Sequence, residues 1–99
     1  MRVMLRATLD TQASNVAIEN GTLPHLFESM FERLKPEAAY FTGNEGDRSC
    51  ILIFDMQDSS QLPVVCEPFF VHLGAKVDVQ PVMNREELQK GLAASQSGS

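Results

Sequence analysis

Two side chains in the apolar segment between Ser59 and Ala75 could transfer protons. Glu67 is the only formally charged side chain in that segment, and His72 follows it near the end. A carboxylate buried without a cation holds its proton tightly, so Glu67, or His72 in its place, is a candidate catalytic base. In the structural alternative, Glu67 points outward or accepts hydrogen bonds from the backbone amides where Pro68 begins a new helical turn. His72 then interacts with a helix C-terminus. We favour the structural alternative for both side chains.

A second group of polar side chains alternates with apolar ones along the strand expected at residues 2–9. If the apolar side chains pack on helices, the polar ones face the other way. The candidate ligand-binding residues on that face are Arg6, Tyr40, Asp55 and Asp78, with Phe41 in place of Tyr40 if the register differs. Arg6 and the hydroxyl of Tyr40 would hold a small anionic or phenolic ligand. The alternative, which we favour because both charge signs are present, is a network of ion pairs between subunits, Arg6 with Asp55 or Asp78.

No motif for a metal ion or a cofactor is evident. His25 and His72 belong to different expected helices, and Cys50 and Cys66 lie in separate apolar runs without CxxC spacing. P-loop, GxGxxG, GxSxG and HExxH patterns are absent. We therefore expect no metal and no cofactor, and two reduced, buried cysteines.

The charge distribution excludes several classes of partner. Eight Lys and Arg against 13 Asp and Glu give the 99-residue chain a net charge of −5, and the positive charges are scattered. This pattern argues against nucleic acid and anionic membranes as partners. Arg6 and Asp10 interrupt the apolar stretch behind Met1, so that stretch predicts neither a signal peptide nor a spanning helix. We expect a cytoplasmic protein.

The elements that must position these residues follow from hydrophobic periodicity and turn signals. Alternation predicts strands over residues 2–9 and 75–83, and the turn formers of residues 43–47 predict a hairpin between strands 37–42 and 48–56. Helical spacing predicts helices over 10–20, 22–35 and 61–73, with Pro68 kinking or restarting the last. A short helix starting at Asn84 closes a single domain of residues 1–92, and residues 93–99 are expected to be a disordered tail.

The element order is therefore β-α-β-β-α-β, which predicts a ferredoxin-like α+β sandwich. Its four-stranded antiparallel sheet would carry helices on one face and leave the other bare. Strand 48–56 is nevertheless apolar on both faces, since Ile51 and Ile53 oppose Cys50, Leu52 and Phe54. A sheet with one face in water should alternate there. We therefore expect a homodimer in which a second copy covers the bare face.

Several segments carry a resemblance to a known group of proteins: RVMLRATLD, NGTLPHLFESMFERLKPEAAYF, the FDM at 54–56 and EPFFVHLGAKVDVQPVM. In these the chain resembles small bacterial domains of unknown function in the ferredoxin-like, dimeric α+β barrel superfamily. The resemblance implies two domains that close their sheets against one another. The superfamily includes cofactor-free monooxygenases, muconolactone-isomerase-like enzymes, haem-handling proteins and stress-related binders. The chain carries no catalytic motif of any of them, and a shared fold does not select among these functions.

Three hypotheses of function follow. The leading one is a homodimeric domain that binds a small molecule in a cavity between sheet and helices or at the dimer interface. The alternative is a cofactor-free isomerase or monooxygenase acting on a small aromatic or enol substrate, with Glu67 or His72 as base and Arg6 or Tyr40 stabilising an oxyanion. The third is a structural interaction module. The sequence leaves open whether the protein is an enzyme.

Overall fold

The computed structural model describes residues 1–98, and Ser99 lies outside the described residues. The elements in chain order are β1 (Arg2–Thr8), α1 (Thr11–Glu19), α2 (Thr22–Leu34), β2 (Ala38–Asn44), β3 (Asp47–Asp55), α3 (Gln61–Leu73), β4 (Lys76–Pro81) and α4 (Arg85–Gly98). The predicted α+β class and the four-stranded antiparallel sheet are confirmed. The strands and the first three helices lie within a few residues of the predicted ranges.

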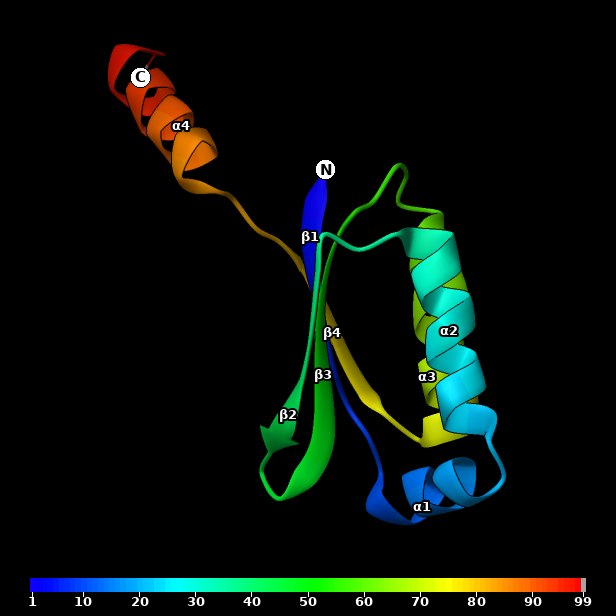
Figure 1. The fold of residues 1–99 in the computed structure, drawn as a ribbon. Coiled ribbons are helices and arrows are strands. Elements are labelled where there is room, and N and C mark those ends of the chain that lie inside the picture. Colours follow the sequence, from blue (N-terminus) through cyan, green and yellow to red (C-terminus); the bar gives the residue numbers. More distant parts are fainter. Residues whose placement is uncertain (99) are drawn as a thin grey trace.

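The strands form one sheet in the order β2-β3-β1-β4, and every neighbouring pair is antiparallel. β1 is therefore central, although it comes first in the chain, and β2 and β4 are the two edges. Figure 1 shows α1, α2 and α3 on one side of this sheet. Among residues 1–98 no helix packs on the other side, which we call the open face.

The core lies between the sheet and the three helices. Alternate residues of β1 and β3 point into it, because successive side chains of a strand face opposite ways. The buried apolar side chains of strands and helices with at most 2% exposure are Val3, Leu5, Ala7, Ala17, Cys50, Leu52, Phe54, Val65, Phe69 and Leu73. The face of β1 predicted from its alternation is thus confirmed as the core face.

Local sequence signals account for the boundaries of most elements. Asp10 caps α1, because its carboxylate accepts a hydrogen bond from the Ala13 amide at 2.9 Å. Gly21, at φ +82°, takes the left-handed conformation that separates α1 from α2. Glu45 and Gly46 both have positive φ and form a two-residue hairpin turn. The hairpin loop is therefore shorter than the predicted 43–47, and strand pairing continues to Asn44.

α3 passes through Pro68 as one continuous helix, where the sequence suggested a kink or a restart. Proline removes one backbone hydrogen bond from a helix interior. The buried side chains Val65, Phe69 and Leu73 lie on both sides of Pro68 along the chain. Their packing holds both halves of α3 against the core, which explains why the helix continues. Leu62, in the first turn of α3, is 37% exposed and lies outside this buried set.

α4 extends from the end of β4 away from the domain, on the side of the open face (Figure 1). It begins with reciprocal caps: the Asn84 side chain accepts from the Glu87 amide, and the Glu87 carboxylate accepts from the Asn84 amide, each at 2.8 Å. α4 continues beyond residue 92 to Gly98, into the segment expected to be a tail. Alanine and glutamine in this stretch favour helix. Within residues 1–98, no helix combines the length and the apolar character needed to cross a membrane.

Candidate functional site

Three of the four candidate ligand-binding residues form one row across the open face. In the strand register, Tyr40 of β2 lies opposite Ile51 of β3, Ile51 opposite Arg6 of β1, and Arg6 opposite Asp78 of β4. All four side chains have the same parity and so point to the open face. The register thus places Tyr40 on this face, while Phe41 points to the helix side. We call the three polar residues, Tyr40, Arg6 and Asp78, the polar row.

The charged members of the polar row have no partner within the described residues. Arg6 and Asp78 are both exposed and directly opposite, yet no ion pair or side-chain hydrogen bond of either one occurs among residues 1–98. Tyr40 is 62% exposed. A guanidinium, a carboxylate and a phenol are therefore available on this face to a ligand or to a second copy of the chain.

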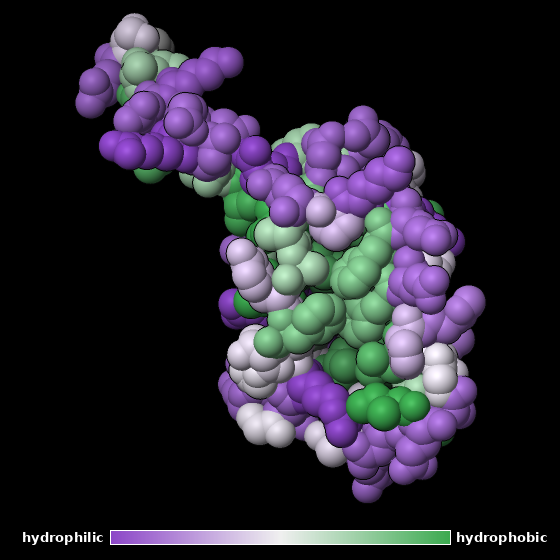
Figure 2. Space-filling view, viewed as in Figure 1, coloured by the Kyte–Doolittle hydropathy of each residue, from purple (hydrophilic) through white to green (hydrophobic). Residues whose placement is uncertain are grey.

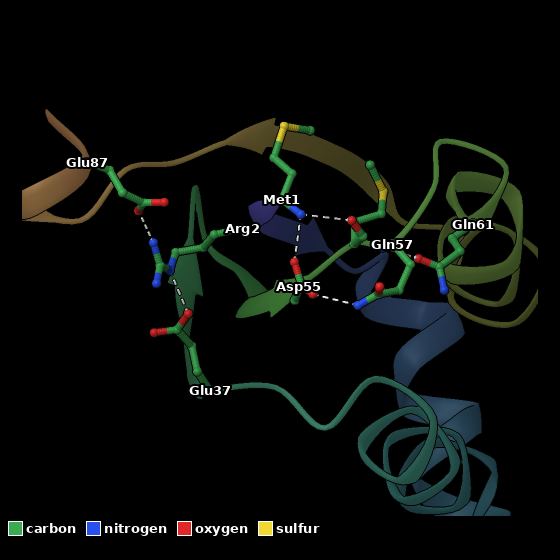
Figure 3. Close-up of polar contacts among 8 residues, drawn as sticks. Met1, Arg2, Glu37, Asp55, Gln57, Gln61 and Glu87 are labelled. Carbon is green, nitrogen blue, oxygen red and sulfur yellow. Dashed lines mark hydrogen bonds and ion pairs between the residues drawn. The ribbon is translucent and has the colours of Figure 1, made fainter. Parts of the chain in front are cut away.

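Asp55, the fourth candidate, lies at the end of the open face and is held by structural contacts (Figure 3). Its Oδ1 accepts from the α-amino group of Met1 at 2.6 Å, and its Oδ2 accepts from the Gln57 amide nitrogen at 2.5 Å. The hydrogen bond and charge of the Met1 amino group, with a smaller contribution from Gln57, lower the pKa of Asp55. Both carboxylate oxygens thus have partners inside the domain, and a ligand-binding role for Asp55 stays a prediction.

Arg2 connects three elements at the same end of the sheet. Its Nε donates to Glu37 at 2.7 Å, just before β2, and its Nη1 donates to Glu87 at the start of α4. The hydrogen bond from Asn84 is the largest cause of the lowered pKa of Glu87, and the charge of Arg2 adds to it. Figure 3 shows Glu37 and Glu87 on opposite sides of the guanidinium. This cluster ties the base of α4 to the sheet.

Glu67 and His72 lie on α3, in the helix layer. Both side chains are exposed, and Glu67 is in the middle of a continuous helix, away from any helix N-terminus. The sheet separates α3 from the open face that carries Arg6 and Tyr40. One chain therefore does not bring together the base and the oxyanion-stabilising group of the enzyme hypothesis, and their catalytic roles stay predictions.

A cleft of about 340 Å³ opens between the sheet and the helices at the β2 edge; we call it the sheet–helix cleft. Its lining residues are Leu9, Ile18, Leu23, Phe27, Phe41, Thr42, Arg48, Ser49 and Cys50. Figure 2 shows hydrophobic side chains gathered in the hollow between the β2 edge and α2. The rings of Phe27 and Phe41 meet edge to face, with centroids 5.2 Å apart. The volume lies within the usual range of small-molecule sites.

Arg48 supplies the one formally charged group among the residues that line this cleft. Its Nη1 donates to Ser14 Oγ at 2.6 Å, to Asn15 Oδ1 at 2.9 Å and, more weakly, to the Thr11 carbonyl oxygen at 3.5 Å. Ser14 is fully buried, so this contact anchors the guanidinium to α1. Among residues 1–98 every hydrogen bond of the Arg48 guanidinium uses Nη1, which leaves Nε and Nη2 as donors for a ligand oxygen.

The thiol of Cys50 in the sheet–helix cleft is not in its reactive form. Burial raises the pKa of the Cys50 thiol to about 11. The thiol is therefore protonated at neutral pH, and the thiolate is the nucleophilic form of cysteine. A cavity between sheet and helices was expected from the sequence, but the residues that line this cleft could not be identified, because they come from five separate elements or loops. The signal that could have shown it is Phe41, an aromatic side chain on the helix side of an edge strand.

In the part of the chain that the structure describes, no three His, Cys, Asp or Glu side chains lie close enough together to hold a metal ion. The two histidines nevertheless line a common cleft of about 260 Å³ between α2 and α3, which sequence analysis did not predict. Compared with known proteins, the chain matches no family model and no curated protein sequence.

Proposed function

We propose that this protein is a homodimeric, ferredoxin-like domain that binds a small aromatic molecule in the sheet–helix cleft. The observation that carries the binding proposal is the cleft itself: an apolar, aromatic hollow with one anchored guanidinium at its rim. Aromatic walls favour a planar ring, and the open donors of Arg48 favour a phenolic or enolic oxygen on it. Anchoring by Ser14 and Asn15 reduces the entropy that Arg48 loses when a ligand binds.

The strand order supports the ferredoxin-like arrangement. β1 and β2 run in the same direction, and β3 lies between them. β3 and β4 also run in the same direction, with β1 between them. Each strand-helix-strand unit is therefore split by a strand of the other unit, which is the pattern of the split βαβ fold.

The composition of the open face supports the homodimer. Met4, Ile51 and Ile53 form an apolar centre that is only half-buried in one chain. Around it, β1 and its partners on this face carry three cations and two carboxylates: Arg2, Arg6, Lys76, Asp55 and Asp78. The face is thus nearly neutral on a chain of net charge −5. A two-fold axis would let Arg6 of each copy meet Asp78 of the other.

Two free cysteines are consistent with a reducing compartment, and we propose the cytoplasm. Cys50 is buried and Cys66 half-buried, and both thiols have a raised pKa because of their burial. Neither thiol is therefore readily available for oxidation.

Binding in the sheet–helix cleft is tested with 2-naphthol as the probe, followed by amide NMR shifts of the full chain. We expect saturable shifts at residues of the cleft, and a roughly tenfold loss of affinity in Arg48→Met, which removes the guanidinium donors and keeps an unbranched apolar side chain. Leu23→Trp fills the cleft and should abolish binding. The matched control is Arg33→Met, a charge loss on the other side of α2.

Three results would each contradict the proposed binding site. The first is no saturable shift, and the second is equal affinity in Arg48→Met and Arg33→Met. The third is shifts confined to the polar row, which would place the ligand at the dimer interface instead.

A further inference from the structure

A second cleft lies between α2 and α3, and we call it the interhelix cleft. Its volume is about 260 Å³, and it is lined by Thr22, His25, Leu26, Ser29, Met30, Arg33, Pro68 and His72. It shares no lining residue with the sheet–helix cleft. It is thus a separate site, and the function proposed above does not use it.

The sequence of α2 builds one wall of the interhelix cleft. The lining residues of α2 recur three or four positions apart, which places them on one stripe over three turns. α3 runs in the opposite direction to α2 (Figure 1). His72, in the last turn of α3, therefore lies beside the first turn of α2, where His25 is found. Both histidines of the chain therefore line this end of the cleft.

The cleft has an apolar floor and a polar rim. Leu26 and Met30 are buried, and Pro68 is half-buried. His25, Arg33 and His72 are exposed above them. The two hydroxyl groups of the lining, those of Thr22 and Ser29, add further donors.

The rim carries donors and no carboxylate, on a chain with 13 acidic side chains. Glu28 and Glu32 of α2 and Glu67 of α3 are exposed nearby in the sequence, but none of them lines the cleft. Within residues 1–98, no hydrogen bond or ion pair occupies the side chains of His25, Arg33 or His72. Their donors are therefore open to an external acceptor.

We propose that the interhelix cleft binds a small organic carboxylate. The carboxylate accepts hydrogen bonds from the guanidinium of Arg33, in the last turn of α2, and its apolar body rests on Leu26, Met30 and Pro68 and points toward His25 and His72 at the other end of the cleft. Guanidinium binds carboxylate oxygens in a planar, two-pronged geometry. The apolar floor favours a ligand with a hydrocarbon body over a bare inorganic anion.

The test is an amide NMR titration of the full chain with benzoate, with acetate and benzyl alcohol as partial probes. We expect saturable shifts at cleft residues with benzoate, weaker binding of acetate and no binding of benzyl alcohol. Arg33→Gln should weaken benzoate binding by roughly five- to tenfold, and His72→Gln, at the other end of the cleft, should weaken it less. Arg85→Gln, the same charge loss on α4, is the matched control and should bind benzoate as the wild type does.

Equal benzoate affinity in Arg33→Gln, His72→Gln and Arg85→Gln would overturn the proposal, because general charge attraction would then explain any binding. Shifts located in the sheet–helix cleft, or benzyl alcohol binding as tightly as benzoate, would also overturn it. These outcomes leave the 2-naphthol result untouched, so the two sites succeed or fail independently.

Discussion

The two faces of the sheet are built from the same strands and differ in almost every other respect. On the helix side, Leu5, Leu52 and Phe54 are at most 1% exposed. On the open face, Ile51 and Ile53 are half-buried, and the exposed Arg6 lies opposite Ile51. The helix side alone specifies the fold of one chain, because it contains the hydrophobic core. The open face keeps an apolar centre that folding of one chain does not bury, which supports its proposed role as the surface for association.

The largest effect on stability is expected from a substitution in the core on the helix side of the sheet. Phe69→Ala removes a fully buried ring from α3 and should lower the free energy of unfolding by about 3–5 kcal/mol. Val71→Ala, two residues along the same helix at a side chain that is 71% exposed, should change it by less than about 0.5 kcal/mol. Urea denaturation of both variants measures the difference. Similar midpoints for the two would show that the buried face of α3 is assigned incorrectly.

Much of this contrast between faces could be predicted from the sequence. The alternation of β1 identified its core side. The apolar side chains on both faces of residues 48–56 predicted a second copy over the open face, which stays a prediction. The choice between Tyr40 and Phe41 could not be made, because it depends on hairpin register. The two-residue turn at Glu45 and Gly46 sets that register, and the sequence suggested a longer loop.

The residues that line the clefts could not be predicted from sequence patterns, for a different reason. Leu9, Ile18, Phe27, Phe41 and Arg48 come from five parts of the chain, and each part satisfies its own local periodicity without indicating the others. The meeting of His25 and His72 likewise depends on how α2 and α3 pack. Secondary-structure periodicity states which side of an element is apolar, whereas a cleft depends on the gaps left between elements.

A charge placed in the apolar centre of the open face should weaken the association of two chains without unfolding either one. Ile53→Lys should raise the dissociation constant of the dimer at least about 100-fold, since a buried interface charge without a partner is costly. The fold of the chain should survive, because Ile53 is outside the core. Sedimentation velocity over a dilution series measures the constant, with Val71→Lys on the helix side as control. Equal dissociation constants in the two variants would place the interface elsewhere.

The smallest effect concerns Asp55, at the end of the open face. The Met1 amino group lowers the pKa of Asp55 in the folded protein. A lowered folded pKa means a stabilising contribution that is present above the unfolded pKa, near 4, and is lost as the pH falls through the folded value. Asp55→Asn should therefore lower the melting temperature slightly at pH 7 and make no difference near pH 2. A constant difference at both pH values would contradict the ion pair with Met1.

The mass of the wild-type chain in solution tests most directly whether the open face pairs with a second copy. Light scattering coupled to size-exclusion chromatography at micromolar concentration should return about twice 11.0 kDa. A single species at 11.0 kDa that stays unchanged as the concentration rises would contradict the account. The open face would then remain in water, with Ile51 and Ile53 uncovered.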